Sequence, residues 1–344
     1  MSEETHIEGT LLVGRDFEPT EGRVVVEDGE IAGIEETETD SDAIVIPAFV
    51  NAHTHMGDSI AKEAGAGLSL DDLVAPPDGL KHRLLRAASH EEKVAAMRRS
   101  LSFMERSGTA ACIEFREGGV DGVQVIRDAS DGMAIEPVVL GRETTDAMEI
   151  SDGFGASGAR DDDFDYERNA TRREGKLFGI HAGERDSTDV NPALDLDPDF
   201  LVHMVHPEPL HLDRVEDSEI PIVVCPRSNL VTDAGVAPMA DLAERTTVAL
   251  GTDNVMLNSP SMFREMEFAA KLSSLSAREV LGMATVAGAD IAGLNCGLLE
   301  EGRNADLVVL DGDSDNLAGA QDLVRAVVRR AGVDDVTDVL LAGQ

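Results

Sequence analysis

The sequence contains no tryptophan, one tyrosine and only three cysteines in 344 residues. Cys112, Cys225 and Cys296 are scattered and lack the close spacing of a metal-binding pair. They argue against a disulfide framework and indicate a reducing compartment. Residues 1–4 show neither the basic nor the apolar region of a secretion signal, and no apolar run approaches the roughly 20 residues that cross a bilayer. We therefore expect a soluble cytoplasmic protein that does not enter membranes.

Positive charge is also scarce, because 29 Lys and Arg stand against 67 Asp and Glu, a formal net charge of −38. Such a negative field argues against nucleic acid or an anionic membrane as a partner. High charge often accompanies disorder, but apolar runs such as 222–224 and 307–310 recur and argue against it here. The composition resembles that of halophilic proteins, in which salt screens the repulsion within an acidic surface. An ordinary but very acidic protein is the alternative.

The order of apolar patterns predicts an α/β fold with two parts. Short strand-like runs fill residues 6–46, and two more lie at 305–311 and 336–341, so we expect residues 1–46 and 297–344 to build a small β-sandwich domain. Between them, strand and helix patterns alternate, which predicts a (β/α)8 TIM-type barrel over residues 47–296. Residues 57–80 are expected to form a loop. In 143–175 only 165–174 resembles a helix.

Two histidines end the apolar stretch that enters this barrel. His53 and His55 are two residues apart, and side chains at that spacing share one face of a strand. Two imidazoles on one face at a strand end provide half of a metal site. The alternative is a pair of solvated or core histidines.

Further polar residues follow later predicted strands, where the active sites of such barrels lie. A third imidazole and a nearby carboxylate come from His181 and Glu184, for which surface exposure is the alternative. After the next strand, either His203 or His206 faces the barrel mouth, and one of them is expected to be structural. Polar contacts come from Ser228 and Asn229, and a carboxylate from Asp253, although these are also ordinary turn residues. The ordered set predicts a metal site with a proton-carrying carboxylate.

These motifs resemble the amidohydrolase superfamily, and specifically its cytosine/adenosine deaminase and chlorohydrolase-like branch. The matching segments are Ala-His-Thr-His at 52–55, His-Ala-Gly-Glu at 181–184, Leu-Val-His at 201–203, Cys-Pro-Arg-Ser-Asn at 225–229, Gly-Thr-Asp at 251–253, and the flanking runs 47–55 and 305–311. They span essentially the whole chain. The resemblance implies one divalent metal, zinc or iron, held by His53, His55, His181 and Asp253. Binuclear relatives use a lysine after the fourth strand, and no lysine occurs between Lys93 and Lys176.

The resemblance also implies hydrolysis of a non-peptide C–N bond, most simply deamination of a nucleobase-like or other small N-heterocycle. Asp253 would accept a proton from the attacking water, Glu184 would carry protons to the leaving nitrogen, and His203 would stabilise the tetrahedral intermediate. The alternatives are a cyclic amide or carbon–halogen hydrolase with the same site, and a non-catalytic metal-binding barrel. Relatives are often dimers, so a homodimer is expected.

Substrate contacts are less clear. His206, Ser228, Asn229 and Arg116 are candidates; Arg116 or Lys81 could meet an anionic or carbonyl group, with a surface ion pair as the alternative for each. The His-Ala-Pro-Tyr-like motif that many relatives carry after the fourth strand is absent from 152–157. The aromatic platform of some adenosine-type deaminases is missing as well. The resemblance therefore implies the reaction class and not the substrate.

Overall fold

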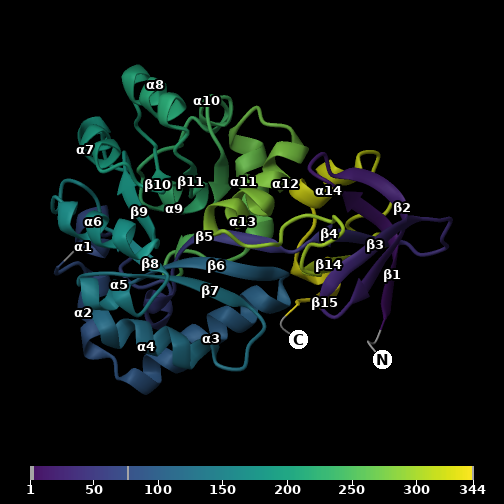
Figure 1. Ribbon diagram of the computed structural model, residues 1–344, viewed down its shortest axis with the longest axis horizontal. Helices are drawn as coiled ribbons and strands as arrows, with labels where there is room; N and C mark the ends of the chain where they lie inside the picture. Colours follow the sequence, from purple (N-terminus) through teal and green to yellow (C-terminus); the bar gives the residue numbers. More distant parts are fainter. Residues whose placement is uncertain (1–3, 76, 343–344) are drawn as a thin grey trace.

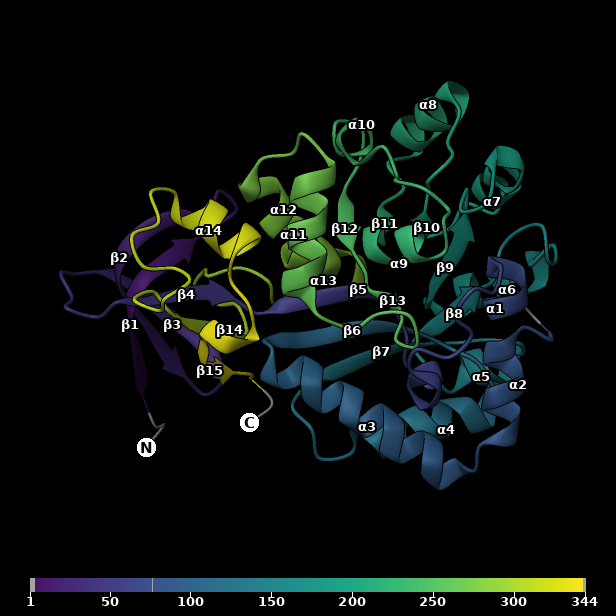
Figure 2. The same cartoon turned by 180° about the vertical axis from the view of Figure 1, so that it is seen from behind.

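The computed structural model describes residues 4–75 and 77–342, and it places the β-strands in two sheets (Figure 1). One sheet has six strands and lies at one end of the molecule, and the other has nine strands and is surrounded by helices (Figures 1 and 2). Residues 1–3 and 343–344 lie outside the described residues. The expected terminal β domain includes all of them, and the expectation about a secretion signal concerns residues 1–4. No helix of the described chain is long and apolar enough to cross a membrane.

The six-stranded sheet joins strands from both ends of the chain. Its order is β15-β14-β4-β1-β2-β3, with bounds β1 Thr5–Val13, β2 Glu18–Glu27, β3 Glu30–Glu36, β4 Ala43–Pro47, β14 Leu307–Asp311 and β15 Val336–Leu340. β1 and β4 pair in parallel, whereas the other neighbouring strands are antiparallel. The predicted pairing of the two termini is therefore seen in the sheet. That they form a sandwich domain bounded at residues 46 and 297 stays a prediction.

The strand that enters the barrel begins one residue after a strand of the six-stranded sheet. β4 ends at Pro47, and β5 (Phe49–His55) follows in the other sheet, so a single apolar stretch supplies two strands. Ala48 between them donates its backbone N–H to the carbonyl of Asp306. The change of sheet at this residue places the two histidines at the carboxyl end of β5.

The nine-stranded sheet is parallel throughout and curled, consistent with a TIM-like barrel (Figures 1 and 2). Its order is β12-β11-β10-β9-β8-β7-β6-β5-β13. The remaining bounds are β6 Thr109–Arg116, β7 Glu136–Gly141, β8 Gly153–Ala156, β9 Leu177–Ala182, β10 Phe200–His203, β11 Ile222–Val224, β12 Val248–Leu250 and β13 Asp253–Asn254. The two outermost strands, β12 and β13, are consecutive in the chain. One segment therefore pairs with β11 through its first part and with β5 through its last.

Helices follow most of these strands and cover the sheet. Their bounds are α3 His90–Arg106, α4 Gly119–Ser130, α5 Thr145–Glu149, α6 Asp165–Glu174, α7 Val190–Asp195, α8 Pro209–Ser218, α9 Pro226–Val231, α10 Met239–Ala243, α11 Met262–Leu272, α12 Ala277–Ala284, α13 Val286–Ala292 and α14 Leu323–Arg329, with 3-10 turns η2 Ser187–Asp189 and η3 Val333–Asp335. The predicted helix 165–174 matches α6 in both bounds. Because each crossover returns the chain to the same side of the sheet, all strand carboxyl ends meet at one edge.

Two segments differ from the sequence-based expectation. Residues 57–80, expected to form a loop, contain η1 (Met56–Ala61), α1 (Leu70–Val74) and the start of α2 (Leu80–Ala87). The irregular segment 143–175 contains α5 and the fourth barrel strand, β8. The sequence of β8 is Gly-Phe-Gly-Ala, and glycine is depleted in strands. Its two glycines are required by close packing, because a Cβ on Gly155 would lie 2.7 Å from the Phe115 ring.

Candidate functional site

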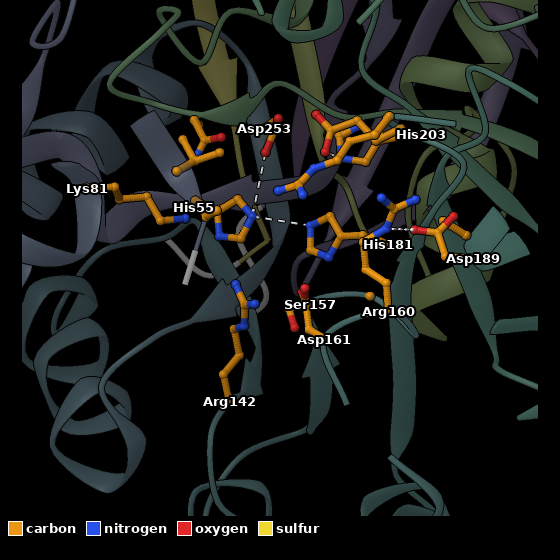
Figure 3. A pocket seen from close by; sticks show the side chains of 17 residues that line it. His55, Lys81, Arg142, Ser157, Arg160, Asp161, His181, Asp189, His203 and Asp253 are labelled. Carbon is orange, nitrogen blue, oxygen red and sulfur yellow. Dashed lines mark hydrogen bonds and ion pairs between the residues drawn. The ribbon is translucent and has the colours of Figure 1, made fainter. Parts of the chain in front are cut away.

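Three histidines from two strands converge at the carboxyl edge of the curled sheet, and Figure 3 shows two of them, His55 and His181. His53 and His55 come from β5 and His181 from β9, and one ring nitrogen of each lies within 4.8 Å of the others. Nε2 of His55 is 3.4 Å from Nε2 of His181. The other nitrogens are held from behind, since His181 Nδ1 donates to the Ala156 carbonyl at 2.7 Å and His55 Nδ1 to the Phe115 carbonyl at 3.2 Å. These bonds leave the Nε2 lone pairs of both rings facing each other.

Asp253 completes this group from β13, the strand next to β5. Its Oδ1 lies 3.3 Å from His53 Nε2 and 3.5 Å from His55 Nε2, because β13 pairs directly with β5. Its Oδ2 accepts the Ser228 hydroxyl at 2.6 Å. The backbone of Asp253 is left-handed, with φ 57°, a conformation that persists only where surrounding contacts enforce it. The structure thus aims one carboxylate oxygen at the histidines and ties the other to α9.

The donor set fits a divalent cation. His53 is fully buried, yet neither of its ring nitrogens has a hydrogen-bond partner among the described residues. Buried polar atoms without partners are costly, and so are two lone pairs facing each other at 3.4 Å. A cation between these atoms removes both costs. Three imidazole nitrogens with one carboxylate oxygen are also a usual zinc donor set.

A second pair of side chains lies beside this group. Glu184 follows β9, and its Oε2 is 3.7 Å from Nε2 of His203, at the end of β10. One ligand atom each of Glu184, His203 and Asp253 lies within 4.8 Å of the others. Asn229 Nδ2 donates to His203 Nδ1 at 3.1 Å, so a neutral His203 carries its proton on Nε2, towards Glu184. Like Asp253, His203 has a left-handed backbone, with φ 81°.

Burial sets the protonation of the centre. It lowers the pKa of His53, His55 and His181, in the case of His55 to about 3, where the charge of Lys81 adds to the effect. Burial also raises the pKa of the Glu184 carboxyl. For Asp253, burial acts in the same upward direction, but the close approach of His53 and the charge of the neighbouring imidazoles hold its pKa well below the ordinary value. The imidazoles are therefore neutral, as metal ligands must be, and the two carboxylates differ in basicity.

The other sequence-based candidates occupy different places. Ser228 and Asn229 are buried and contact Asp253 and His203, without lining the pocket beside the histidines. His206 is exposed and Arg116 is buried, and neither lines this pocket. The Arg116 guanidinium instead lies 3.1 Å from a Glu114 oxygen. Of the two histidines after β10, His203 is thus the one that faces the site.

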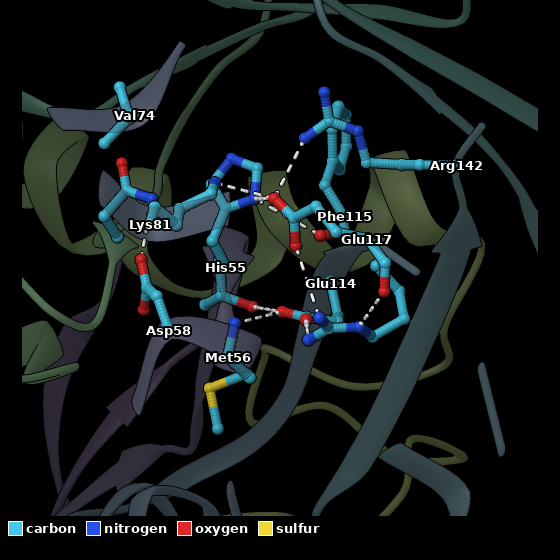
Figure 4. Close-up of polar contacts among 12 residues, drawn as sticks. His55, Met56, Asp58, Val74, Lys81, Glu114, Phe115, Glu117 and Arg142 are labelled. Atoms are coloured by element: carbon cyan, nitrogen blue, oxygen red, sulfur yellow. Dashed lines mark hydrogen bonds and ion pairs between the residues drawn. The ribbon is translucent and has the colours of Figure 1, made fainter. Parts of the chain in front are cut away.

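The sequence analysis did not select two residues of the site, Glu117 and Arg142, and it allowed a surface position for a third, Lys81. Glu117 Oε1 lies 2.9 Å from His55 Nδ1, and Lys81 and Arg142 line the pocket (Figures 3 and 4). Lys81, for which a surface ion pair was the alternative, is only 3 % exposed. Glu117 and Arg142 each follow the last residue of a strand, β6 and β7. The rule that polar residues just past a barrel strand face the site would have selected both.

The model of the amidohydrolase family matches residues 44–185 and 178–344. The chain belongs to the amidohydrolase family. A putative aminohydrolase of Methanothermobacter thermautotrophicus is 35 % identical over 88 % of this chain and 90 % of its own length. A 5-methylthioadenosine/S-adenosylhomocysteine deaminase of Halobacterium salinarum is 28 % identical over all of this chain and 92 % of its own. This amidohydrolase is therefore an enzyme, a hydrolase of non-peptide C–N bonds.

Solved structures share the same fold. An adenosine deaminase from Xanthomonas campestris with bound zinc superposes with a TM-score of 0.85 at 21 % identity, covering 98 % of this chain and 92 % of the other. Atrazine chlorohydrolase from Arthrobacter aurescens, complexed with zinc, has a TM-score of 0.81 at 17 % identity, with coverage of 98 % and 94 %. The fold of this amidohydrolase is thus found in enzymes with different leaving groups. Family membership and the His/Asp cluster together support a divalent metal in its site.

Proposed function

We propose that this amidohydrolase deaminates a small N-heterocycle by hydrolysis, using one zinc ion held by His53, His55, His181 and Asp253. One observation carries the proposal: the three imidazoles and the Asp253 carboxylate converge next to Glu184 and His203. A non-catalytic metal-binding scaffold would need the three imidazoles and Asp253, but it would not need Glu184 and His203. The deaminase relatives and the zinc-containing structural neighbour support both the reaction and the metal.

The proposed ion is single. The fourth barrel strand, β8, and its flanks contain no lysine that could bridge a second metal, and the segment 152–157 reads Asp-Gly-Phe-Gly-Ala-Ser. Zinc suits a nitrogen-rich set with a single carboxylate better than magnesium or calcium, which prefer oxygen ligands, although iron also accepts imidazole. When bound, such an ion lowers the pKa of a water from about 15.7 towards about 7 and so supplies a nucleophile.

The proton transfers are assigned to Glu184. The pKa of its carboxyl is raised by burial, whereas that of Asp253 is held down, and paired carboxylates in opposite environments usually divide the acid and base roles. As a carboxylate, Glu184 would take a proton from the attacking water and give it to a ring nitrogen of the substrate. It would then take the hydroxyl proton of the tetrahedral intermediate and give it to the amino nitrogen, so that ammonia leaves as the carbonyl forms. Asp253 orients the attacking water by accepting its hydrogen bond at Oδ1, because Oδ2 is occupied by Ser228.

His203 is assigned to the oxygen that gains charge in the tetrahedral intermediate. Asn229 fixes the proton of the neutral ring on Nε2, which lies on the Glu184 side of the pocket. A donor fixed before the reaction stabilises such an oxygen without reorganising. Asn229 is thus a positioning residue, and we propose the same role for Ser228 at Asp253.

A product screen of the zinc-loaded protein tests the proposal. The panel holds cytosine, guanine, adenosine derivatives, a cyclic amide and chlorotriazines, and ammonia, chloride and ring opening are measured separately. Ammonia release that disappears after chelation, and returns with zinc, is the expected result. Chloride release or ring opening without ammonia would replace deamination by the alternative hydrolytic reactions. Tight zinc binding with no product from any compound would favour a non-catalytic metal-binding barrel.

A further inference from the structure

Two buried cations beside the metal site share one counter-ion. Lys81 Nζ lies 2.6 Å from Glu117 Oε1, and Arg142 Nη1 lies 3.1 Å from the same oxygen (Figure 4). His55 Nδ1 is a third neighbour of that oxygen, at 2.9 Å. The Arg116 guanidinium also approaches Glu117, at 3.4 Å from Oε2. A single carboxylate thus faces three permanent positive charges.

The other cations of the pocket are neutralised locally. Arg160 contacts two carboxylates, at 3.1 Å from Asp189 and 2.9 Å from Asp186, and Arg185 lies 2.6 Å from Asp71. Burial raises the pKa of the nearby Asp58 carboxyl to about 7 although the charge of Lys81 opposes the shift, and the described residues show no ion pair between the two. The Asp58 oxygens accept from Asn254 Nδ2 at 2.8 Å and from the Met256 backbone at 3.0 Å. Among the described residues that line this pocket, Lys81 and Arg142 are therefore the cations that have fewer carboxylate partners than positive charges.

Unused donors of both side chains face the pocket. A lysine has three N–H groups and an arginine five, and within the described chain the side-chain contacts of Lys81 and Arg142 are limited to Glu117. Both residues line the same pocket as His55 and His181, and Figure 3 shows them approaching His55 from two different elements. Buried charge without full compensation is costly, so the arrangement calls for an anion. In a chain of net charge −38, this pocket is a local exception, because its lining has four basic side chains and four acidic ones.

We propose that Lys81 and Arg142 bind an anionic substituent, a carboxylate or phosphate, of the heterocyclic substrate. The inference rests on the proposed function, because it places the reacting ring at the metal site and the anion on the Lys81 side of His55. Arg142 offers a planar fork that suits carboxylate and phosphate alike, and Lys81 adds a point charge. Glu117 holds both cations in place and, through Nδ1, also orients His55.

The first experiment compares substrates that differ in one charged group. Adenosine is paired with adenosine 5′-phosphate, pterin with pterin-6-carboxylate, and cytosine with cytosine-5-carboxylate, and kcat/KM is measured at one fixed salt concentration. Charge-assisted hydrogen bonds predict a preference of about 10- to 100-fold for the anionic member of at least one pair. The carboxylate and phosphate pairs distinguish the two sources of charge. Equal kcat/KM values within every pair that is turned over would overturn the proposal.

The second experiment removes each cation. Lys81→Met and Arg142→Met should lower kcat/KM for the anionic member by about 10- to 100-fold more than for the neutral member, whereas Arg142→Lys should restore part of this difference. Arg173→Met, which removes an exposed positive charge on α6, is the matched control. A merely structural role for Lys81 or Arg142 would lower both members of a pair equally, and that result would reject the anion site.

A binding measurement separates this inference from the proposed function. Zinc-loaded Glu184→Gln protein is titrated calorimetrically with each pair of compounds, with and without Lys81→Met, so that no turnover is needed. Tighter binding of the anionic member, lost with Lys81→Met, would support the anion site even if the wild-type protein released no ammonia. Equal binding of both members would overturn it even if deamination were confirmed.

Discussion

Two carboxylates of the site have opposite electrostatic environments, and this difference assigns their roles. Burial raises the pKa of Glu184, and its neighbour His203 offsets this only in part. Asp253 is more deeply buried, but it lies 3.3 Å from His53 Nε2 and accepts from Ser228, so its charged form is stabilised. A carboxyl that exchanges protons near neutral pH must have the raised pKa, because proton transfer is most effective when the pKa lies near the working pH. Glu184 meets this condition.

Replacing Glu184 by glutamine should therefore remove proton transfer and leave metal binding intact. We expect Glu184→Gln to keep stoichiometric zinc and to lose about 10²–10⁴-fold in kcat, the usual contribution of a positioned acid–base group. Turnover and metal content are measured on the same preparation, with Glu174→Gln on the exposed end of α6 as the matched control. Near-normal turnover in Glu184→Gln would refute the assigned role.

Ser228 should act through Asp253 alone. Its hydroxyl donates to Oδ2 at 2.6 Å and fixes the direction of Oδ1, so Ser228→Ala frees the carboxylate to rotate. Partners that orient a metal ligand typically contribute 10- to 100-fold in metal affinity or activity, and we expect a zinc affinity about 10- to 100-fold weaker. Competition with a chromophoric chelator measures the affinity, and Ser218→Ala, exposed at the end of α8, is the control. An unchanged affinity would show that β13 alone positions Asp253.

The residues that could be predicted from the sequence are those whose local spacing determines their direction. His53 and His55 face one way because a strand alternates its side chains, and His181, Glu184, His203 and Asp253 each follow a recognisable apolar run. Glu117 and Arg142 also follow apolar strands, β6 and β7, but the same rule was not applied to them, and Arg116 was preferred to Glu117. The adjacent side chains leave the strand on opposite sides, and only the three-dimensional register shows that Glu117 faces His55.

At the scale of elements, a buried ion pair fastens two helices beneath the site. Glu265 on α11 accepts the backbone N–H of Arg227 on α9 at 3.0 Å, and its Oε2 lies 3.2 Å from Arg227 Nε. α9 also carries Ser228 and Asn229, which position Asp253 and His203. Burial raises the pKa of Glu265 from 4.5 to about 7, although Arg227 opposes the shift. The pair therefore contributes a pH dependence to stability.

The sign follows from proton uptake. Between pH 4.5 and about 7, the folded chain keeps a proton on Glu265 that the unfolded chain has released, so the free energy of unfolding falls as the pH rises through this range. A shift of this size corresponds to a loss on the order of 3 kcal/mol by pH 8. Glu265→Gln cannot titrate, so this component should be absent from the variant.

Urea unfolding of the metal-free protein at pH 5 and pH 8 measures the effect. The decrease in unfolding free energy between the two values should be smaller in Glu265→Gln than in the wild type, by up to about 3 kcal/mol. Glu267→Gln lies on the same helix with its carboxylate at the surface, and it should behave like the wild type. Identical slopes in the wild type and Glu265→Gln would contradict the assignment.

The order of elements could be predicted more fully than their edges. Strands with long apolar runs, such as β6, β9 and β10, can be recognised in the sequence, because burial on both faces requires such runs. β8 was missed since its glycines are selected by close packing, Gly153 against Leu177 and Gly155 against Phe115, a tertiary cause with no local signal. No break in the apolar pattern marks the split between β4 and β5: the pattern continues across Ala48, and only the pairing partners change.

At the scale of the whole molecule, the charge opposes compaction. The excess of 67 acidic over 29 basic residues gives a net charge of −38. Repulsion among these charges destabilises the compact state, and the effect is larger when the repulsion acts over a longer distance. The range is about 10 Å in 0.1 M salt and about 3 Å in 1 M salt. Local positive charge at Lys81 and Arg142 does not change this balance, because both side chains are buried. We therefore propose that the folded chain is adapted to a salt-rich interior.

This adaptation predicts a specific dependence of Tm on salt. The Tm of the zinc-loaded protein should rise by several degrees between 0.1 and 1 M KCl, and much less between 1 and 3 M, because screening is nearly complete once the Debye length reaches about 3 Å. Strengthening of the hydrophobic effect by excluded solutes would instead increase steadily with concentration and would be reproduced by sucrose. Scanning calorimetry in KCl and in sucrose of matched water activity distinguishes the two causes. If the Tm instead stayed constant or decreased between 0.1 and 1 M KCl, the acidic side chains would lie far enough apart for the fold to be stable without salt. The chain would then be an ordinary acidic protein.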